Sequence, residues 1–404
     1  MTPFPPIYLD NNATTRVDPQ VVEAMLPYFT EQFGNPSSMH AFGSAVGGAL
    51  ATARKQVQAL LGAAHDHEVV FTASGSESDS TAILSALAAN PERREIVISA
   101  VEHPAVLALC QHLEKQEGYT LHIIPVDRKG RLEIDAYRAA LSERVAVVSI
   151  MWANNETGTL FPVEPLAEWA KEFDIQFHTD AVQAVGKIAL DLKSSAIDML
   201  SLSGHKLHAP KGIGALYVKR GTRFRPLIRG GHQERGRRAG TENAPAIIGL
   251  GRAAELALAS MHDENTRVRA LRDRLETGLT RSIGHCFVTG DPENRLPNTA
   301  NVAFEYIEGE AILLLLNRSG IAASSGSACT SGSLEPSHVM RAMGIPYTAA
   351  HGATRFSLSR ETTAEEIDRV LAVMPGIIDQ LRRLSPYWNS ETGSANQAFE
   401  PAYA

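Results

Sequence analysis

From residue 69 onward, the sequence alternates between short apolar segments and longer helical segments. The apolar segments, which predict strands, span 69–72, 95–98, 121–124, 145–150 and 175–178. The predicted helices lie near 77–89, 104–115, 135–141 and 164–173. Strands separated by helices form βαβ units, which build a mostly parallel sheet with helices on both faces. Ligands of such sheets bind beyond the carboxyl ends of the strands, so the loops that follow the strands are the first candidates for a site.

The rest of the sequence predicts a second, smaller domain. A helical run over about 244–282 leads out of the alternating region, and strands and helices are mixed after it. The predicted strands lie at 301–304 and 355–359, and the predicted helices at 311–316 and 364–384. We therefore predict an α/β fold with a large cofactor-binding domain over 16–260 and a small α+β domain over 1–15 and 261–385. The polar residues 386–404 show no pattern and are expected to form a flexible tail.

Charge and cysteine content argue against several classes of function. The 404 residues carry a formal charge of −7 with no basic block, which argues against nucleic acid or an anionic membrane as the main partner. No long apolar run could span a bilayer, and the first residues lack the features of a signal peptide. Cys110, Cys286 and Cys329 are too few and too scattered for a disulfide framework or a zinc site. We therefore expect a cytoplasmic protein with reduced thiols and no resident metal.

One lysine, Lys206, is held in a tight turn between two predicted strands, 196–200 and 214–218. Small residues and a histidine crowd it in the sequence Ser203-Gly204-His205-Lys206. A lysine in a tight, partly dry turn is uncharged often enough to act as an amine nucleophile toward an aldehyde. Taken alone, the same string also fits a solvated turn lysine, so the interpretation depends on the other loops.

Three other loops carry groups that an aldehyde cofactor would need. Gly75 and Ser76 open a helix after a strand and predict an anion site, although such turns are often only caps. Asp180 ends an apolar strand, where it could pair with a pyridinium N–H or merely cap the next helix. His103 offers an imidazole that could stack on a flat ring, or it is an ordinary loop residue. Together the four loops match pyridoxal 5′-phosphate, and the chain has no P-loop that would favour a nucleotide.

Several motifs in a fixed order make the sequence resemble the cysteine desulfurases of the class V aminotransferase family. These motifs lie at 8–15, 34–38, 102–104, 154–158, 178–183, 203–206 and 324–329. The resemblance spans residue 7 to about 385, and stretches 235–243 and 321–343 are most similar to the nitrogen-fixation type. It implies a fold-type I pyridoxal phosphate enzyme.

The resemblance also implies a role for each matching residue. Lys206 would hold the cofactor covalently and later move the Cα proton, while His103 would stack on the ring and assist proton transfer. Asp180 would pair with the pyridine nitrogen, and Gln183 would bond the phenolic oxygen. The phosphate would be held by Gly75, Ser76, Ser203 and His205, with Thr241 contributed by the second subunit of a homodimer. Asn155, beside the cofactor, and Arg355 would hold the substrate carboxylate, with Asn35 as a lesser candidate.

The implied reaction converts L-cysteine to L-alanine, with the sulfur transferred to Cys329 as a persulfide. Cys329 lies in a Ser/Gly/Ala-rich loop that is expected to be mobile. The sulfur would pass to an iron–sulfur scaffold protein for cluster assembly connected with nitrogenase, and Cys329 could transiently ligate a shared cluster.

Three alternatives remain open. A selenocysteine lyase or another pyridoxal phosphate β-lyase would share the cofactor residues. A non-catalytic sulfur carrier or scaffold would use Cys329 only as a docking thiol, although the presence of Lys206, Asp180 and Arg355 argues against it.

Overall fold

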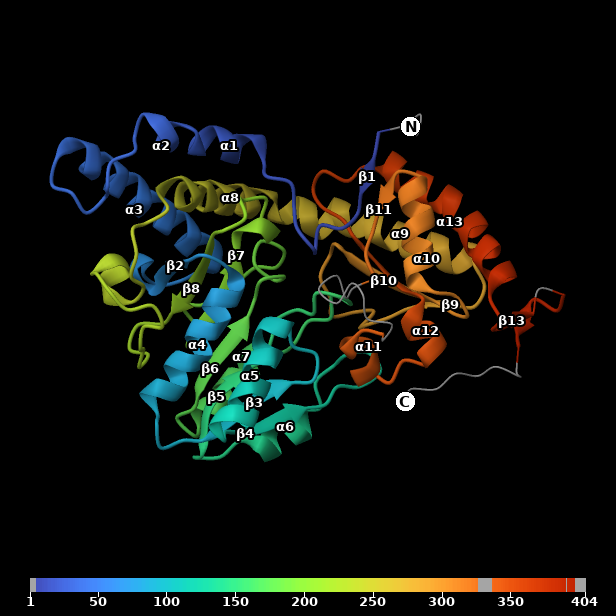
Figure 1. Cartoon of the computed structure of the whole chain (residues 1–404), viewed down its shortest axis with the longest axis horizontal. Coiled ribbons are helices and arrows are strands. Elements are labelled where there is room, and N and C mark those ends of the chain that lie inside the picture. Colours follow the sequence, from blue (N-terminus) through green and yellow to red (C-terminus); the bar gives the residue numbers. More distant parts are fainter. Residues whose placement is uncertain (1–4, 326–335, 390, 397–404) are drawn as a thin grey trace.

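A computed structural model describes residues 5–325, 336–389 and 391–396 of the chain. Figure 1 shows two bodies joined by a long helix: a large α/β body, and a smaller one formed mainly by the C-terminal part of the chain. The N-terminal strand β1 (Ile7–Tyr8) lies beside the smaller body.

The large body is built on a mostly parallel sheet, which confirms the predicted fold class. Seven strands lie in the order β2-β8-β7-β6-β5-β3-β4. Their bounds, in that order, are Val69–Thr72, Gly214–Val218, Met199–Ser203, Gln176–Asp180, Val145–Ser149, Glu95–Ser99 and Thr120–Ile124. β8 runs antiparallel to both of its neighbours, and the other pairs are parallel. Except in the edge strand β4, all residues of these strands are buried, which explains why most of the strands are rich in apolar residues.

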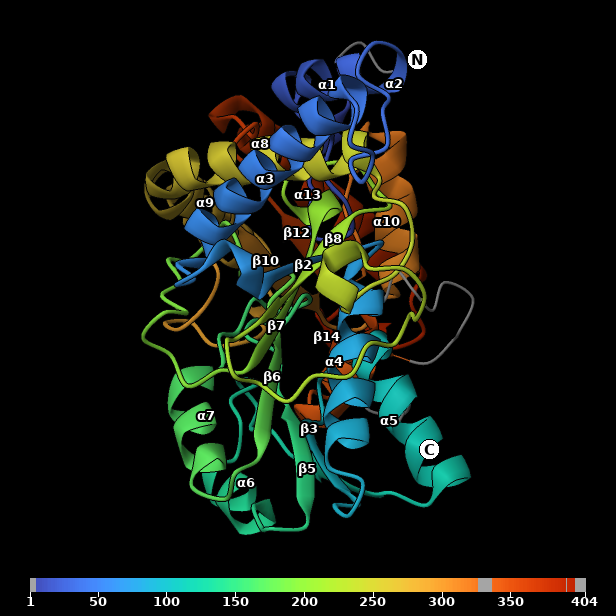
Figure 2. The same ribbon diagram turned by 90° about the vertical axis from the view of Figure 1, so that its left-hand side faces the viewer.

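Helices cover both faces of this sheet. Figure 2 shows α6 (Ile134–Ala140) and α7 (Val163–Lys171) on one side, and α4 (Gly75–Ala89) and α5 (Pro104–Glu117) on the other. The remaining N-terminal helices are α1 (Pro19–Met25), α2 (Pro27–Thr30) and α3 (Ala41–Leu61). Short 3-10 turns lie at η1 (Asp66–Glu68), η2 (Gly204–Lys206) and η3 (Gln233–Gly236).

A single helical run of 39 residues, Ala244–Ser282, connects the two bodies and matches the predicted span. It consists of α8 (Ala244–Asp263), a π turn η4 (Glu264–Val268) and α9 (Arg269–Ser282). Of the described helices, this one alone has the length and apolar composition of a membrane span, but half of its most apolar window is buried inside the protein. α8 packs along α3, which is the position of a core helix.

The small body has its own core and a short antiparallel sheet. The sheet has the order β12-β10-β9, with bounds Ala353–Ser357, Thr299–Phe304 and Cys286–Val288. β1 pairs in parallel with β11 (Ile321–Ala322). The helices are α10 (Gly309–Arg318), α11 (His338–Ala342), α12 (Tyr347–His351) and α13 (Ala364–Leu384). Leu9, Phe304 and Phe356 are fully buried in the core of this body.

The C-terminal tail differs in part from the expectation of a patternless segment over 386–404. β13 (Trp388–Asn389) pairs with β14 (Ser394–Ala395) in a short hairpin. The Trp388 ring lies edge-on to the His285 ring, with 5.0 Å between their centroids, and the Arg382 guanidinium lies 4.7 Å from the Trp388 centroid. These contacts pack the start of the tail against the small body, which the polar composition of the tail does not predict.

Candidate active site

A cavity of about 270 Å³ lies at the carboxyl ends of β6 and β7, between the two bodies. The sheet rule predicted this location. The predicted site residues that line the cavity are Gly75, Ser76, His103, Asn155, Asp180, Gln183, Ser203, His205, Lys206 and Arg355. The structure therefore gathers residues that lie as far apart in the sequence as positions 75 and 355.

Lys206 ends the short turn η2 that follows β7. Its Nζ donates hydrogen bonds to the carbonyl oxygens of Asn12 at 2.5 Å and Ala13 at 2.7 Å. Burial lowers the pKa of Lys206 to about 8, and the positive charges of Arg355 and Lys187 contribute to the shift. The neutral amine, which a nucleophile requires, is therefore present in about one-tenth of the molecules at pH 7 and in a much smaller fraction for an ordinary lysine.

Attachment of pyridoxal phosphate to the cofactor-free protein is expected to accelerate as the pH rises through about 8, because only the neutral Lys206 amine attacks an aldehyde. Below that pH, the neutral fraction falls about tenfold per pH unit. Rapid-mixing absorbance measurements at pH values from about 6 to about 10 would give the rate of attachment on both sides of this pKa. A midpoint near the ordinary lysine value of 10.5 would show that the site does not tune this amine.

Asp180 is the last residue of β6 and is buried at the cavity wall. Its Oδ1 accepts a hydrogen bond from the Val182 backbone N–H at 2.9 Å. Burial raises the pKa of Asp180, whereas the charges of His103 and Lys206 oppose that rise. Asp180 forms no ion pair with another described residue, and a buried carboxyl of this kind suits a protonated ring nitrogen. Gln183 Nε2 donates to the Asn12 carbonyl oxygen, while its Oε1 is buried and has no hydrogen-bond partner among the described residues.

The N-terminus of α4 provides the anion site. Ser74 caps this helix by accepting the Glu77 N–H, and Gly75 and Ser76 are its first residues. A Cβ on Gly75 would lie 2.9 Å from Val182 Cγ2 and 3.3 Å from Ser203 Cβ, so only glycine leaves this corner open. Free N–H groups at the start of a long helix, with hydroxyls beside them, favour a phosphate.

His103 caps α5 through its ring, because its Nδ1 accepts the Ala105 N–H at 3.2 Å. Burial lowers the pKa of His103, and the positive charge of Lys206 adds to this effect, whereas Asp180 opposes it. A neutral ring fixed in this way is a suitable stacking surface. The residues present therefore fit pyridoxal phosphate: an amine, an acid, an anion site and a flat ring face one cavity.

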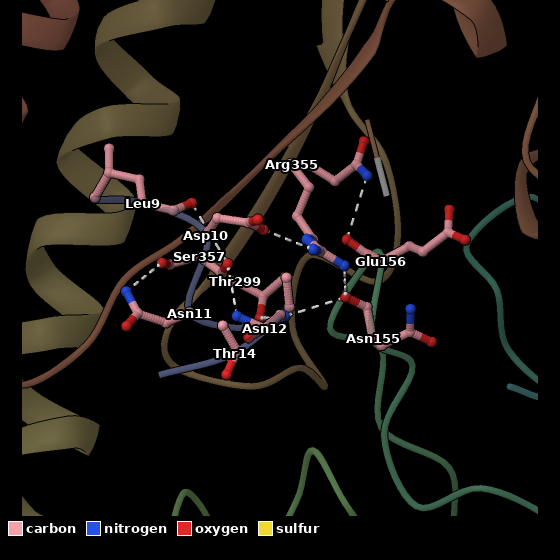
Figure 3. Close-up of polar contacts among 12 residues, drawn as sticks. Leu9, Asp10, Asn11, Asn12, Thr14, Asn155, Glu156, Thr299, Arg355 and Ser357 are labelled. Carbon is pink, nitrogen blue, oxygen red and sulfur yellow. Dashed lines mark hydrogen bonds and ion pairs between the residues drawn. The ribbon is translucent and has the colours of Figure 1, made fainter. Parts of the chain in front are cut away.

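Arg355 lies at the centre of β12 and is only 2% exposed (Figure 3). Its Nη2 contacts Asp10 Oδ1 at 2.8 Å, and its Nη1 donates to the Asn155 carbonyl oxygen at 2.9 Å. Its Nε is buried without a hydrogen-bond partner. The predicted strand 355–359 begins two residues later than β12, so the arginine sits inside the strand rather than at its start.

The segment Asp10–Asn12 joins the two bodies at this point (Figure 3). Asn12 Nδ2 donates to the Asn155 carbonyl oxygen at 3.1 Å and to Thr299 Oγ1 at 2.9 Å. Asn12 Oδ1 accepts from Asn298 Nδ2 at 3.1 Å. This segment belongs to the motif at 8–15, for which the sequence predicted no individual role.

Three predicted site residues are not brought to the cavity by the described chain. Asn35 is exposed in the loop before α3, where its Oδ1 accepts the Ser37 N–H at 2.9 Å. Thr241 lines a separate depression of about 200 Å³ with Gly240 and Asn243. Cys329 lies outside the described residues. Their roles stay predictions.

Other residues that line the cavity were assigned no role from the sequence. They include Asn12, Asp79, Glu156 and His338. His338 Nε2 donates to the Glu102 carbonyl oxygen at 3.0 Å, and Glu156 Oε2 accepts from Ser337 Oγ at 2.6 Å. In the described ranges, no group of three or more His, Cys, Asp or Glu side chains could hold a metal ion.

Comparison with known proteins agrees with this chemistry. The family model "Aminotransferase class-V" matches residues 7–370. A cysteine desulfurase of Gluconacetobacter diazotrophicus is 73% identical over 398 residues, which cover 98% of this chain and 99% of the relative. The cysteine desulfurase NifS of Azotobacter vinelandii is 69% identical over 399 residues, with the same coverage. Among solved structures, a NifS-like protein aligns with a TM-score of 0.87 at 36% identity, covering 93% of this chain and 100% of the other. The chain therefore belongs to the aminotransferase class-V family and, within it, to the pyridoxal-phosphate-dependent cysteine desulfurases.

Proposed function

We propose that the cavity around Lys206 converts L-cysteine to L-alanine and that Cys329 takes up the sulfur as a persulfide. The observation that carries the proposal is the meeting of three groups in one cavity: the Lys206 amine, the Asp180 carboxyl and the Arg355 guanidinium. The identity of 69–73% to cysteine desulfurases over nearly the whole chain supports the same reaction.

Bound pyridoxal phosphate supplies the electron sink that allows an amino acid to lose its Cα proton. Asp180 would hold the proton on the pyridine nitrogen, because a buried carboxylate needs a cationic partner. Lys206 Nζ, with its lowered pKa, would accept the Cα proton and later return a proton to the substrate. Arg355 would bind the substrate carboxylate with its planar fork, beside its existing contact with Asp10.

The sulfur step balances without an external oxidant. The Cys329 thiolate attacks the substrate sulfur, so an S–S bond forms while the Cβ–S bond breaks. The electron pair of the broken bond stays with the substrate carbon, which is then protonated to a methyl group. L-Cysteine and a protein thiol thereby give L-alanine and a protein persulfide.

We further place this reaction in the cytoplasm, as the sulfur source for an iron–sulfur scaffold protein that serves nitrogenase assembly. The NifS name of the Azotobacter vinelandii relative supports the nitrogen-fixation role. Cys329 would deliver the persulfide sulfur and could transiently ligate a shared cluster.

We also propose a homodimer in which Thr241 reaches the phosphate of the partner's cofactor. Thr241 lies outside the cavity of its own chain, and large apolar side chains are exposed near the N-terminus, among them Phe29, Phe33 and Phe42, at 59%, 68% and 60%. Exposed apolar surface of this kind is typical of an interface. Sedimentation at assay concentration is expected to give a dimer, and a fully active monomer would contradict the proposal.

Replacing Cys329 with alanine tests the sulfur step. The parent protein, incubated with L-cysteine without added thiol, is expected to form alanine and gain one sulfur atom in its intact mass. The Cys329→Ala protein is expected to bind the cofactor and to change its absorbance with L-cysteine, because those steps use Lys206, Asp180 and Arg355. Its rate of alanine formation should fall by about 100-fold or more.

The other functions give different results in the same experiment. If Cys329→Ala forms alanine at the parent rate, the thiol is not required and a selenocysteine lyase or another β-lyase fits better. If the parent accepts a persulfide from another protein but never forms alanine, the sulfur-carrier function fits better. Cys110→Ala is the matched control, since Cys110 is fully buried in α5 and should not be needed.

A further inference from the structure

A second buried aspartate, Asp79, shares the cavity wall with Asp180. It lies in the second turn of α4 and is 1% exposed. Its Oδ1 lies 3.7 Å from His178 Nε2 and has no hydrogen-bond partner in the part of the chain that the structure describes. No step of the proposed reaction uses this side chain, so its charge state must be explained separately.

The histidine beside Asp79 does not supply a positive charge. His178 hydrogen bonds with Ser149 Oγ through Nδ1 at 2.8 Å and with Ser201 Oγ through Nε2 at 2.9 Å. Burial lowers the pKa of His178 to about 3, so this ring is neutral at physiological pH. The two hydroxyls satisfy both ring nitrogens without a proton from the aspartate.

The other titratable groups that act on Asp79 are carboxyls. They are Asp180, at the end of β6, and Glu102, in the loop before α5. Glu102 Oε1 accepts from the Met151 N–H at 3.0 Å and from Ser99 Oγ, while its Oε2 is buried without a partner. Buried like charges that lie close together cannot all be ionised. Burial and the Asp180 charge therefore raise the pKa of Asp79 well above its ordinary value.

Of these three carboxyls, Asp180 is the one whose pKa is also lowered by neighbouring basic side chains. It accepts a backbone N–H from Val182, and the charges of His103 and Lys206 favour its ionised form. The Ser201 hydroxyl favours an anionic Asp79, but burial and the neighbouring carboxyl charges oppose it. Among Asp79, Asp180 and Glu102, the negative charge is therefore assigned to Asp180.

We propose that Asp79 is a positioning residue that stays protonated at physiological pH, so that Asp180 is the single anion presented to the cofactor ring. The inference rests on the proposed role of Asp180 and adds a residue that acts through it. A carboxyl kept neutral beside a charged one is a known way of separating two acids in one site. Asp79 then adds no second negative charge that would raise the proton affinity of Asp180.

Infrared spectroscopy of the cofactor-free protein tests the protonation directly. At neutral pH, the parent is expected to show the C=O stretch of a protonated carboxylic acid, which shifts in D₂O. Asp79→Asn should remove part of this band, and Glu102→Gln should remove another part, because the pKa of Glu102 is about 8. Asp174→Asn, whose side chain is 76% exposed, should leave the band unchanged. If Asp79→Asn removes no protonated-carboxyl intensity, the inference is wrong.

A pH titration of the bound cofactor's absorbance gives a second readout. Since asparagine also carries no charge, Asp79→Asn should leave the midpoint of the titration within about 0.3 pH unit of the parent. If Asp79 were ionised, its replacement by asparagine would remove a negative charge near the cofactor and lower the titration midpoint by about one pH unit or more. Such a shift would overturn the inference. Failure of the proposed reaction would appear separately, as absence of alanine, without altering the infrared result of the cofactor-free protein.

Discussion

Replacing Lys206 with alanine is expected to reduce alanine formation from L-cysteine by at least about 10⁴-fold while leaving the protein folded. The substitution removes both the covalent anchor of the cofactor and the group that moves the Cα proton. The fold should tolerate it, because the lost hydrogen bonds to the carbonyl oxygens of Asn12 and Ala13 are offset by the removal of a buried amine near Arg355. We expect the melting temperature to change by no more than about 4 °C.

The matched control is Lys211→Ala, since Lys211 lies five residues further along the same loop and is exposed. It should retain the parent rate, measured as alanine formed per protein. A Lys206→Ala protein that turns over cysteine at the parent rate would contradict the role assigned to this amine.

Replacing Arg355 with alanine is expected to lower kcat/KM for L-cysteine by about 10- to 150-fold, mainly through KM. This range corresponds to the roughly 1.5–3 kcal/mol of a hydrogen bond to a charged group. The guanidinium is fixed between Asp10 Oδ1 and the Asn155 carbonyl, so its fork is already oriented when a carboxylate arrives. Arg355→Lys, which keeps the charge without the fork, should recover only part of the loss.

Arg360→Ala is the matched control for this experiment. Arg360 also pairs with an N-terminal aspartate, since its Nη2 lies 2.6 Å from Asp18 Oδ2, but it does not line the cavity. Its loss should affect stability without raising KM for cysteine. Equal KM values for the parent and Arg355→Ala would assign the substrate carboxylate to another group.

Most of the fold could be predicted because its signals are local. Buried strands such as β2 and β5 are mainly apolar, and the helical run 244–282 continues through the π turn at η4. The order of strands in the sheet and the reversed direction of β8 were not predictable, since they depend on contacts between distant segments. The hairpin in the tail was missed because the aromatic contacts of Trp388 lie far away in the sequence.

The site residues also differ in whether a local sequence signal identifies them. Asp180 ends a strand, and Lys206 and His103 follow strands, so the sheet rule identified these positions from the sequence. The role of Arg355 was predicted only from the resemblance to the cysteine desulfurases. The comparisons confirm that the chain belongs to this family. Asn12 and Asp79 were missed for physical reasons: Asn12 acts through contacts 143 residues or more away, and Asp79 resembles any polar position in a helix.

Borohydride reduction of the cofactor-loaded protein, followed by peptide mass analysis, is the most direct test of the account. The account predicts one label per chain, on the peptide that contains Lys206, because its buried amine has the lowered pKa and lies in the cavity with Asp180. A label on Lys187 or Lys211 instead, or no label on a protein that still makes alanine, would contradict it.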